Sequence, residues 1–227
     1  TPQRPAQHAK KDKAPKPTVA LATTATNATH QTSTQRPTAP RKANMTRITP
    51  ITDCDQLPSD RQHEWDFILE NNGGVRGPFG VMLTSPGIAP AFLALIQQAR
   101  GTGVVSAALH ELAILAVAYE YQAPYQWSAH IARARESGLS EAAIEVARNG
   151  SDHAGLDAGE RDVVEITRQL CRSHHVDQPT FNALAATYGS DWLTYVIATI
   201  GLYQCVATFN NAYDVDPRPG DDQLPVG

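Results

Sequence analysis

The stretch HELAILAVAYEYQAPYQWSAHIARARESG, residues 110–138, decides the fold. Seven consecutive apolar residues, 112–118, leave no polar side, so they predict a helix that is buried all round. A proline-containing turn follows and predicts a second helix. Glu111 starts the first helix and His130 lies on the second, so a carboxylate and an imidazole flank the most buried element. We expect the chemistry of this protein there.

Capping signals predict further helices on both sides of this stretch. Serine and aspartate side chains can accept hydrogen bonds from the first turn of a helix, and they precede four of the apolar-periodic runs. These caps are Ser59, Ser106, Ser140 and Asp157. Gly189 is expected to break the chain before a last, largely apolar helix, and residues 77–80, GPFG, are expected to form a loop. Few strand signals occur, so the sequence predicts an all-α helical bundle.

Charge is distributed unevenly along the 227 residues. Residues 1–44 hold eight Lys or Arg, one acid and almost no large apolar side chains, and we predict a disordered basic tail there. Of the 19 basic and 23 acidic residues, 11 and 22 remain in residues 45–227, a net charge of −11. An acidic body argues against nucleic-acid binding. We expect one domain at 45–217 and a loose tail at 218–227.

The chain carries few signs of targeting or of disulfide bonding. Residues 1–44 lack the apolar core of a secretory signal; they resemble an organelle transit peptide faintly, and an extension before a start at Met45 is the interpretation we favour. Cys54, Cys171 and Cys205 are far apart and form no CxxC. This usage favours a reducing, cytoplasmic location and predicts no metal site. No apolar run reaches transmembrane length, so we expect no membrane partner.

Two helices are too apolar for the surface of a monomer, namely residues 112–118 with their surroundings and the last helix, about 191–211. One explanation is that both pack at the centre of a single bundle. The other is that one of them forms a subunit interface, and we favour this homo-oligomer.

The ordered set of motifs resembles the carboxymuconolactone decarboxylase family, which shares its all-α fold with the alkylhydroperoxidase AhpD. The AhpD branch has the pattern Glu, eleven residues, Cys, two residues, Cys, three residues, His. Glu111 and His130 have this spacing, but Ala123 and Gln126 stand at the cysteine positions. Peroxide reduction needs a nucleophilic and a resolving thiol, so the resemblance does not extend to peroxidase activity.

A cysteine-free branch of the family is similar to this chain over about residues 47–217. Its Tyr-Glu-Trp corresponds to Tyr125-Gln126-Trp127, its second-half helix start to residues 156–161, LDAGER, and its late Gly-x-Tyr-His to residues 201–204, with Gln204 in place of the histidine. The resemblance implies a small-molecule substrate, no cofactor, and a homo-oligomer that is a trimer or a multiple of one.

The decarboxylases of the family act on a small anionic lactone, and loss of CO₂ leaves an enolate that must be held and protonated. His130 suits the proton transfer because an imidazole titrates near neutral pH. Glu111 is expected to orient the ring and Tyr125 to donate to the developing oxyanion. These three residues are the predicted catalytic set.

The predicted substrate-binding residues are Gln126, Trp127, Arg133 and Gln204, with Arg76 as an alternative anion-binding side chain. Each has a structural alternative: a packed histidine or aromatic ring, a satisfied interior amide, or a solvated arginine. The function has an alternative too, a family relative that has lost catalysis and acts as a binding or assembly module. An enzyme requires a ligand-sized cavity beside Glu111 and His130, whereas the non-catalytic alternative expects side chains to fill that space.

Overall fold

The computed structural model describes residues 46–101, 103–153, 155–218, 220 and 222–225. All the helices found there lie in the unit Lys42–Gly227, and these described residues contain no strand. Two short 3₁₀ segments, Cys54–Gln56 and Ser59–Arg61, precede the α-helices. The α-helices are α1 (Gln62–Asn72), α2 (Pro78–Met82), α3 (Ile88–Gly101), α4 (Ala107–Glu120), α5 (Pro124–Glu136), α6 (Glu141–Asn149), α7 (Ala158–Ser173) and α8 (Gln178–Ala212). The predicted all-α class is confirmed, and the predicted tail 1–44 lies outside the described residues.

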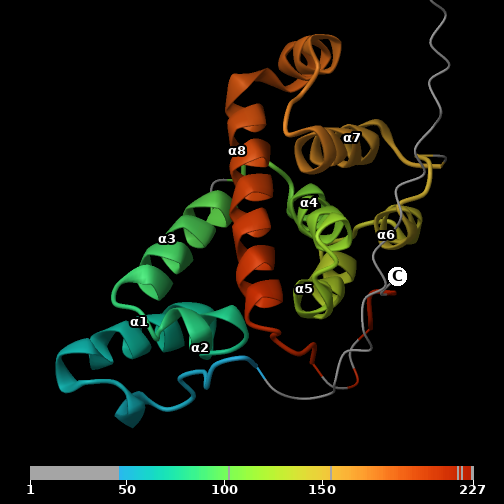
Figure 1. Cartoon of the computed structure of the whole chain (residues 1–227). Helices are drawn as coiled ribbons and strands as arrows, with labels where there is room; N and C mark the ends of the chain where they lie inside the picture. The colour runs from blue at the N-terminus through green and yellow to red at the C-terminus, as the bar shows by residue number, and fades with distance from the viewer. Residues whose placement is uncertain (1–45, 102, 154, 219, 221, 226–227) are drawn as a thin grey trace, which may run out of the picture. The chain divides into compact units, whose positions relative to one another are not determined.

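Helix α4 is the centre of the bundle, in contact with α5, α6, α7 and α8 (Figure 1). Its residues are buried without a break from His110 to Ala118, as the absence of a polar side predicted. The whole of that apolar run is therefore covered within one chain.

The predicted caps set where the helices begin. The side chain of Ser106 accepts from the backbone N–H of Leu109, that of Ser140 from Ala143, and that of Asp157 from Glu160. Each bond satisfies one of the free N–H groups of a first helical turn. These three capping predictions are confirmed, since such bonds depend only on neighbours in the sequence. The predicted cap at Ser59 is wrong, because Ser59 lies in the 3₁₀ segment and α1 begins after Arg61 without a side-chain cap.

Helix α8 is interrupted as predicted, because Gly189 has φ 83° and ψ 168° and is not helical. By length and composition α8 would also be able to cross a membrane, but half of its most apolar window is buried inside the protein. Figure 1 shows its later part lying against α3 on one side and α4 on the other.

Two predictions about irregular segments are corrected. The expected loop at 77–80 contains the start of α2, a short helix that begins with proline and buries all five of its residues. The expected loose tail is attached to the bundle, because Leu224 is buried and Asp222 forms ion pairs with Arg135 and Arg148. Contacts with residues distant in the sequence hold both segments in place, so no local sequence pattern predicts their structure.

Candidate functional site

Glu111 and His130 meet across the elbow between α4 and α5. The Nδ1 atom of His130 lies 2.7 Å from Oε2 of Glu111, and both side chains are buried. The two residues are nineteen positions apart in the sequence, and they meet because the chain turns back at Pro124, where α5 begins. The geometry that the sequence predicted for this pair is present.

Charges around the pair set its protonation. Burial alone would raise the pKa of Glu111, but His130 and Arg100 beside it hold that pKa below its usual value. Burial lowers the pKa of His130, and repulsion from Arg100 and Arg133 adds to this, against the opposite effect of Glu111. The pair is therefore a carboxylate and a neutral imidazole at neutral pH. The Nδ1–H group of His130 donates to the Glu111 carboxylate, which leaves the lone pair of Nε2 free.

Arg100 and Tyr203 extend this pair. Nη2 of Arg100 donates to the Tyr203 hydroxyl at 2.8 Å and lies 3.6 Å from Oε1 of Glu111. The Tyr203 ring meets the His130 ring edge to face, with centroids 5.1 Å apart. Burial raises the pKa of Tyr203 to about 12, so its hydroxyl keeps its proton. Because that hydroxyl accepts from Arg100, its own hydrogen remains available to a ligand oxygen.

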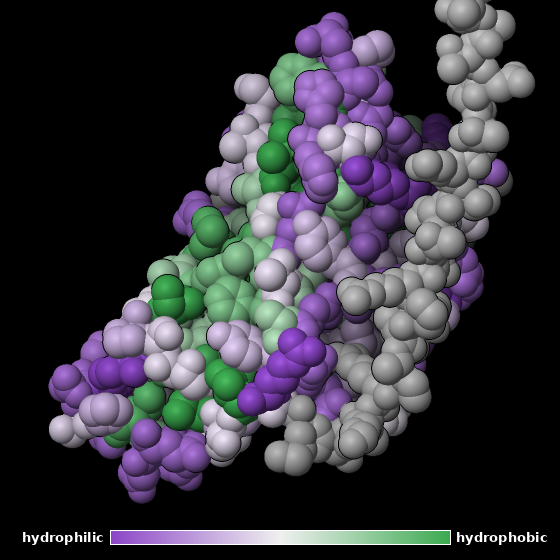
Figure 2. Space-filling model, in the orientation of Figure 1, coloured by the Kyte–Doolittle hydropathy of each residue, from purple (hydrophilic) through white to green (hydrophobic). Residues whose placement is uncertain are grey.

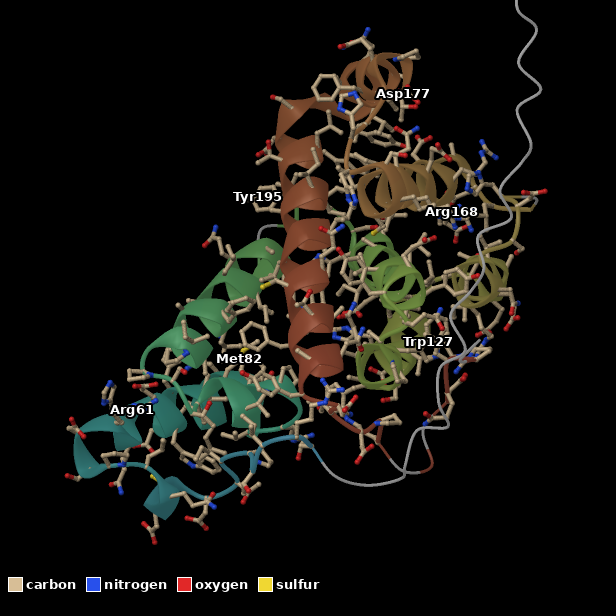
Figure 3. All side chains as sticks on the ribbon, viewed as in Figure 1. Arg61, Met82, Trp127, Arg168, Asp177 and Tyr195 are labelled. Carbon is tan, nitrogen blue, oxygen red and sulfur yellow. The ribbon has the colours of Figure 1, made fainter. Side chains whose placement is uncertain are left out.

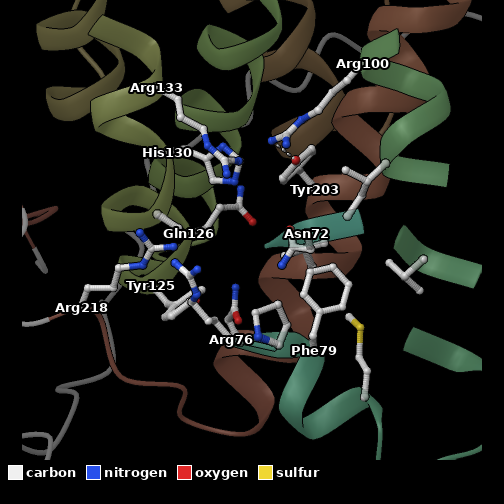
Figure 4. A pocket seen from close by; sticks show the side chains of 17 residues that line it. Asn72, Arg76, Phe79, Arg100, Tyr125, Gln126, His130, Arg133, Tyr203 and Arg218 are labelled. Atoms are coloured by element: carbon white, nitrogen blue, oxygen red, sulfur yellow. Dashed lines mark hydrogen bonds between the residues drawn. The ribbon is translucent and has the colours of Figure 1, made fainter. Parts of the chain in front are cut away.

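His130 and Tyr203 open onto a cavity of about 80 Å³ (Figure 4). That volume holds several water molecules or one small organic molecule, because a single water needs roughly 10–15 Å³ on this measure. The cavity lies between the end of α1, α2, α3, α5, α8 and the segment after α8. A ligand reaching His130 would therefore be small.

The cavity is strongly cationic. Among the described residues, its lining contains four arginines and no carboxylate. Arg76 and Arg133 are exposed, whereas Arg100 and Arg218 are partly buried. In Figure 4, Arg100 and Arg133 lie near His130, and Arg76 and Arg218 lie near Tyr125. A body with net negative charge thus carries a local concentration of positive charge around this cavity.

Several buried polar atoms in the lining have no hydrogen-bond partner within the described part of the chain. They are Arg100 Nε, Gln126 Oε1 and both amide atoms of Asn210. The other amide atom of Gln126 donates to the carbonyl of Ile114 at 3.1 Å, which fixes the side chain. Since buried polar groups are almost always paired, these atoms indicate water or a polar ligand in the cavity.

Three of the predicted binding and catalytic residues line the same cavity as His130, namely Tyr125, Gln126 and Arg133. Burial raises the pKa of Tyr125, although Arg218, Arg76 and Arg133 oppose the shift. Gly77 allows this tyrosine its place, since a Cβ at that position would overlap the Tyr125 ring and φ there is +56°.

The structure places Trp127 and Gln204 away from the cavity, which corrects the prediction that they bind substrate. Trp127 is fully buried beneath the guanidinium of Arg148, 4.9 Å from the ring centroid. Gln204 donates to Sγ of Cys171 at 3.3 Å, between α7 and α8. Neighbouring residues of a helix point about 100° apart. Gln126 and Tyr203 face the cavity, so Trp127 and Gln204, which follow them directly, point elsewhere.

Sequence reasoning missed the roles of Arg100, Tyr203, Asn210 and Arg218. Tyr203 stood inside a quoted family motif, so a signal for it was present. Arg218 falls in the segment predicted as a loose tail, and no motif of the sequence singles out Arg100.

The chain offers neither a thiol site nor a metal cluster in the described residues. Cys54, Cys171 and Cys205 lie outside the lining of the cavity. Burial is the main reason that the pKa of each of these thiols is raised, which disfavours the reactive thiolate. Over the same described residues, no group of three or more His, Cys, Asp or Glu side chains is placed to hold a metal ion.

Comparison with known proteins agrees with the predicted resemblance. Residues 86–169 match the model of the Carboxymuconolactone decarboxylase family. An AhpD-core, uncharacterized peroxidase-related protein from Ralstonia eutropha JMP134 superposes with a TM-score of 0.65 at 20% identity, covering 78% of this chain and 95% of that one. No curated protein matches the chain significantly.

Two further solved structures have the same fold. A peroxidase-related protein from Silicibacter sp. TM1040 has a TM-score of 0.59 at 18% identity, covering 77% of this chain and 92% of that chain. The debrominase Bmp8, solved with 2,3,4-tribromopyrrole, has a TM-score of 0.61 at 20% identity, covering 77% and 93%. At these identities the likeness establishes an AhpD-like fold, and the predicted fold is confirmed.

Proposed function

We propose that the chain is a thiol-independent enzyme of the carboxymuconolactone decarboxylase type that acts on a small carboxylated or lactone substrate, and the match of residues 86–169 to that family's model supports the proposal. The reaction is a decarboxylation or a related proton transfer. One observation carries the proposal: His130, paired with Glu111, opens onto a cavity whose described lining holds four arginines and no carboxylate.

The chemistry follows from where the groups lie. The arginines bind the substrate carboxylate, and the Tyr203 hydroxyl donates to the oxygen that becomes negative as an enolate forms. In a proton transfer, Nε2 of His130 takes a proton from a carbon beside a carbonyl, the C–H electron pair enters the enolate, and the imidazolium returns the proton to another carbon. In a decarboxylation, the C–C electron pair enters the enolate as CO₂ leaves, and the imidazolium donates the replacing proton.

The pH dependence of turnover separates these two reactions. Proton abstraction needs the neutral ring, so its rate falls as pH decreases through the pKa of His130. Decarboxylation needs the imidazolium at the protonation step, so its rate rises as pH decreases over the same interval. The lowered pKa of His130 supports proton abstraction as the first step.

The non-catalytic alternative is less well supported. It expects side chains to fill the space beside Glu111 and His130, and a cavity of about 80 Å³ is there instead. Peroxidase chemistry lacks support as well, since Ala123 and Gln126 occupy the positions of the family's thiol pair.

The test is a screen of the purified protein against small carboxylated lactones and 2-oxo acids, with a hydroperoxide assay as a control. If the wild type turns over one of these substrates, the rate with His130→Ala should be lower by about a hundredfold or more, because positioned acid–base groups contribute a rate factor of about 10²–10⁴. His175→Ala, an exposed histidine, is the matched control. Equal turnover by His130→Ala and the wild type would refute the proposal.

We also propose that the protein is a homo-oligomer. Since α4 is covered within one chain, the support comes from the outer side of α3 and α8, where large apolar side chains remain exposed (Figure 2). These are Ile88, Leu95 and Ile197, at 40%, 51% and 37% exposure. Light scattering should report an oligomer for the wild type and a smaller species for Leu95→Glu; a monomeric wild type would refute it.

A further inference from the structure

The segment after α8 brings one of the four arginines back to the cavity. Val215 is buried against Tyr125 and Val81. Three residues later, the backbone N–H of Arg218 donates to Oγ of Ser128 at 3.3 Å, and the guanidinium lies close enough to Tyr125 to oppose the rise in the pKa of that hydroxyl. The main chain of Arg218 is therefore held against α5. Figure 4 shows Arg218 beside Tyr125 and Arg76.

A second attachment follows within four residues. Asp222 accepts from both terminal nitrogens of Arg148, at 2.7 and 2.9 Å, and from Nη2 of Arg135 at 3.1 Å. The carbonyl of Gln223 accepts from Arg148 at 3.0 Å, and Leu224 is buried. We call residues 215–218 and 222–224 the C-terminal strap. Its arginine site is flanked by an apolar anchor at Val215 and by an ionic one at Asp222.

The ionic anchor itself rests on a rigid base. The Arg148 guanidinium lies over the Trp127 ring at 4.9 Å, and that ring is fully buried in α5. Arg148 also pairs with Glu145 of its own helix at 3.1 Å. Arg148, which holds Asp222, is thus also held by stacking on Trp127 and by its ion pair with Glu145, independently of the strap.

We propose that Arg218 is a ligand-binding residue of the cavity and that Asp222 is the positioning residue that keeps it there. The inference rests on the proposed anionic substrate of the same cavity. A guanidinium already ordered at the site binds an anion without the loss of chain entropy that a free segment would incur. Release of Asp222 would remove the ionic anchor that follows Arg218, so the strap sets the affinity of the cavity for an anion.

Calorimetric titration with maleate, and with neutral maleamide as the matched probe, tests both roles. We expect Arg218→Ala to weaken maleate binding about tenfold and Arg218→Lys to weaken it less, because a charge-assisted hydrogen bond is lost or replaced. We expect Asp222→Asn to weaken binding severalfold. Asp216→Asn, which removes an exposed carboxylate of the same segment, should stay within twofold.

A double-mutant cycle separates positioning from general stability. The effect of Asp222→Asn should disappear in the Arg218→Ala background, since Asp222 acts through Arg218. Hydrogen exchange of the strap amides should rise in Asp222→Asn, whereas maleate should lower it in the wild type.

The outcomes distinguish this inference from the proposed function. If Arg133→Ala weakens maleate binding while Arg218→Ala stays within twofold, the cavity binds anions and the role of Arg218 is overturned. If Asp222→Asn weakens binding equally in both backgrounds, or leaves strap exchange unchanged, its positioning role is overturned. A wild type that binds no maleate would overturn both this inference and the anionic site.

Discussion

The arginines around the cavity and the arginines between α4 and α7 differ in what faces them. Arg172 forms a two-point ion pair with Glu120, and Arg168 lies 4.0 Å from the same carboxylate. Arg168, labelled in Figure 3, also donates to the carbonyl of Ser151. In this region each guanidinium has a protein partner that explains its position.

The cavity arginines lack that balance. Among the described lining residues there is no carboxylate, and Glu111, outside that lining, is shared between His130 and Arg100. Charge that is balanced inside the protein is structural, whereas unbalanced charge around a cavity indicates an anion from outside. The comparison therefore supports the proposed anionic ligand.

The largest expected effect is on anion affinity. Arg100→Met should weaken maleate binding about a hundredfold, because the inner guanidinium and its alignment of Tyr203 are both lost. Arg172→Met, the matched change between α4 and α7, should stay within twofold. Calorimetry measures both, and equal losses in the two variants would remove the distinction between the regions.

The sequence predicted what depends on local spacing and missed what depends on packing. Caps such as Ser106 and the break at Gly189 need only neighbours, and the family spacing of Glu111 and His130 indicated the pair. Arg100 and Arg218 come from α3 and from beyond α8, so only the folded chain brings them to α5. Trp127 was placed in the site by its motif, although one helical step turns it into the core.

The second effect is on the pH dependence of stability. Burial, with Arg100 nearby and despite Glu111, lowers the pKa of His110 to about 4. The unfolded chain binds a proton near pH 6.5, so the folded state binds fewer protons between these values and stability falls as pH falls. The loss from pH 6.5 to 5 should be about 1.5 kcal/mol for this residue.

Urea unfolding of wild type and His110→Gln over pH 5 to 7 measures that slope. The variant should lose this part of the pH dependence. An unchanged slope would mean that His110 titrates normally and that its surroundings between α4 and α8 are less buried than described.

The smallest effect concerns stability at constant pH. Glu120→Gln should destabilise the protein by about 1 kcal/mol, because Arg168 and Arg172 lose their shared carboxylate and Arg172 is half-exposed. Arg133→Gln at the cavity should cost nothing or raise the melting temperature slightly, since it removes unbalanced charge. Calorimetric melting curves of the two variants test this prediction. A larger loss of stability in Arg133→Gln than in Glu120→Gln would contradict it.

The most direct test of the central claim is the nitrogen NMR spectrum of His130 in ¹⁵N-histidine-labelled protein at pH 7, with and without maleate. We expect a neutral ring that is protonated on Nδ1 and unprotonated on Nε2, and an Nε2 resonance that shifts when maleate binds. A doubly protonated ring without maleate, or spectra that do not change on its addition, would contradict a neutral base facing an anion site.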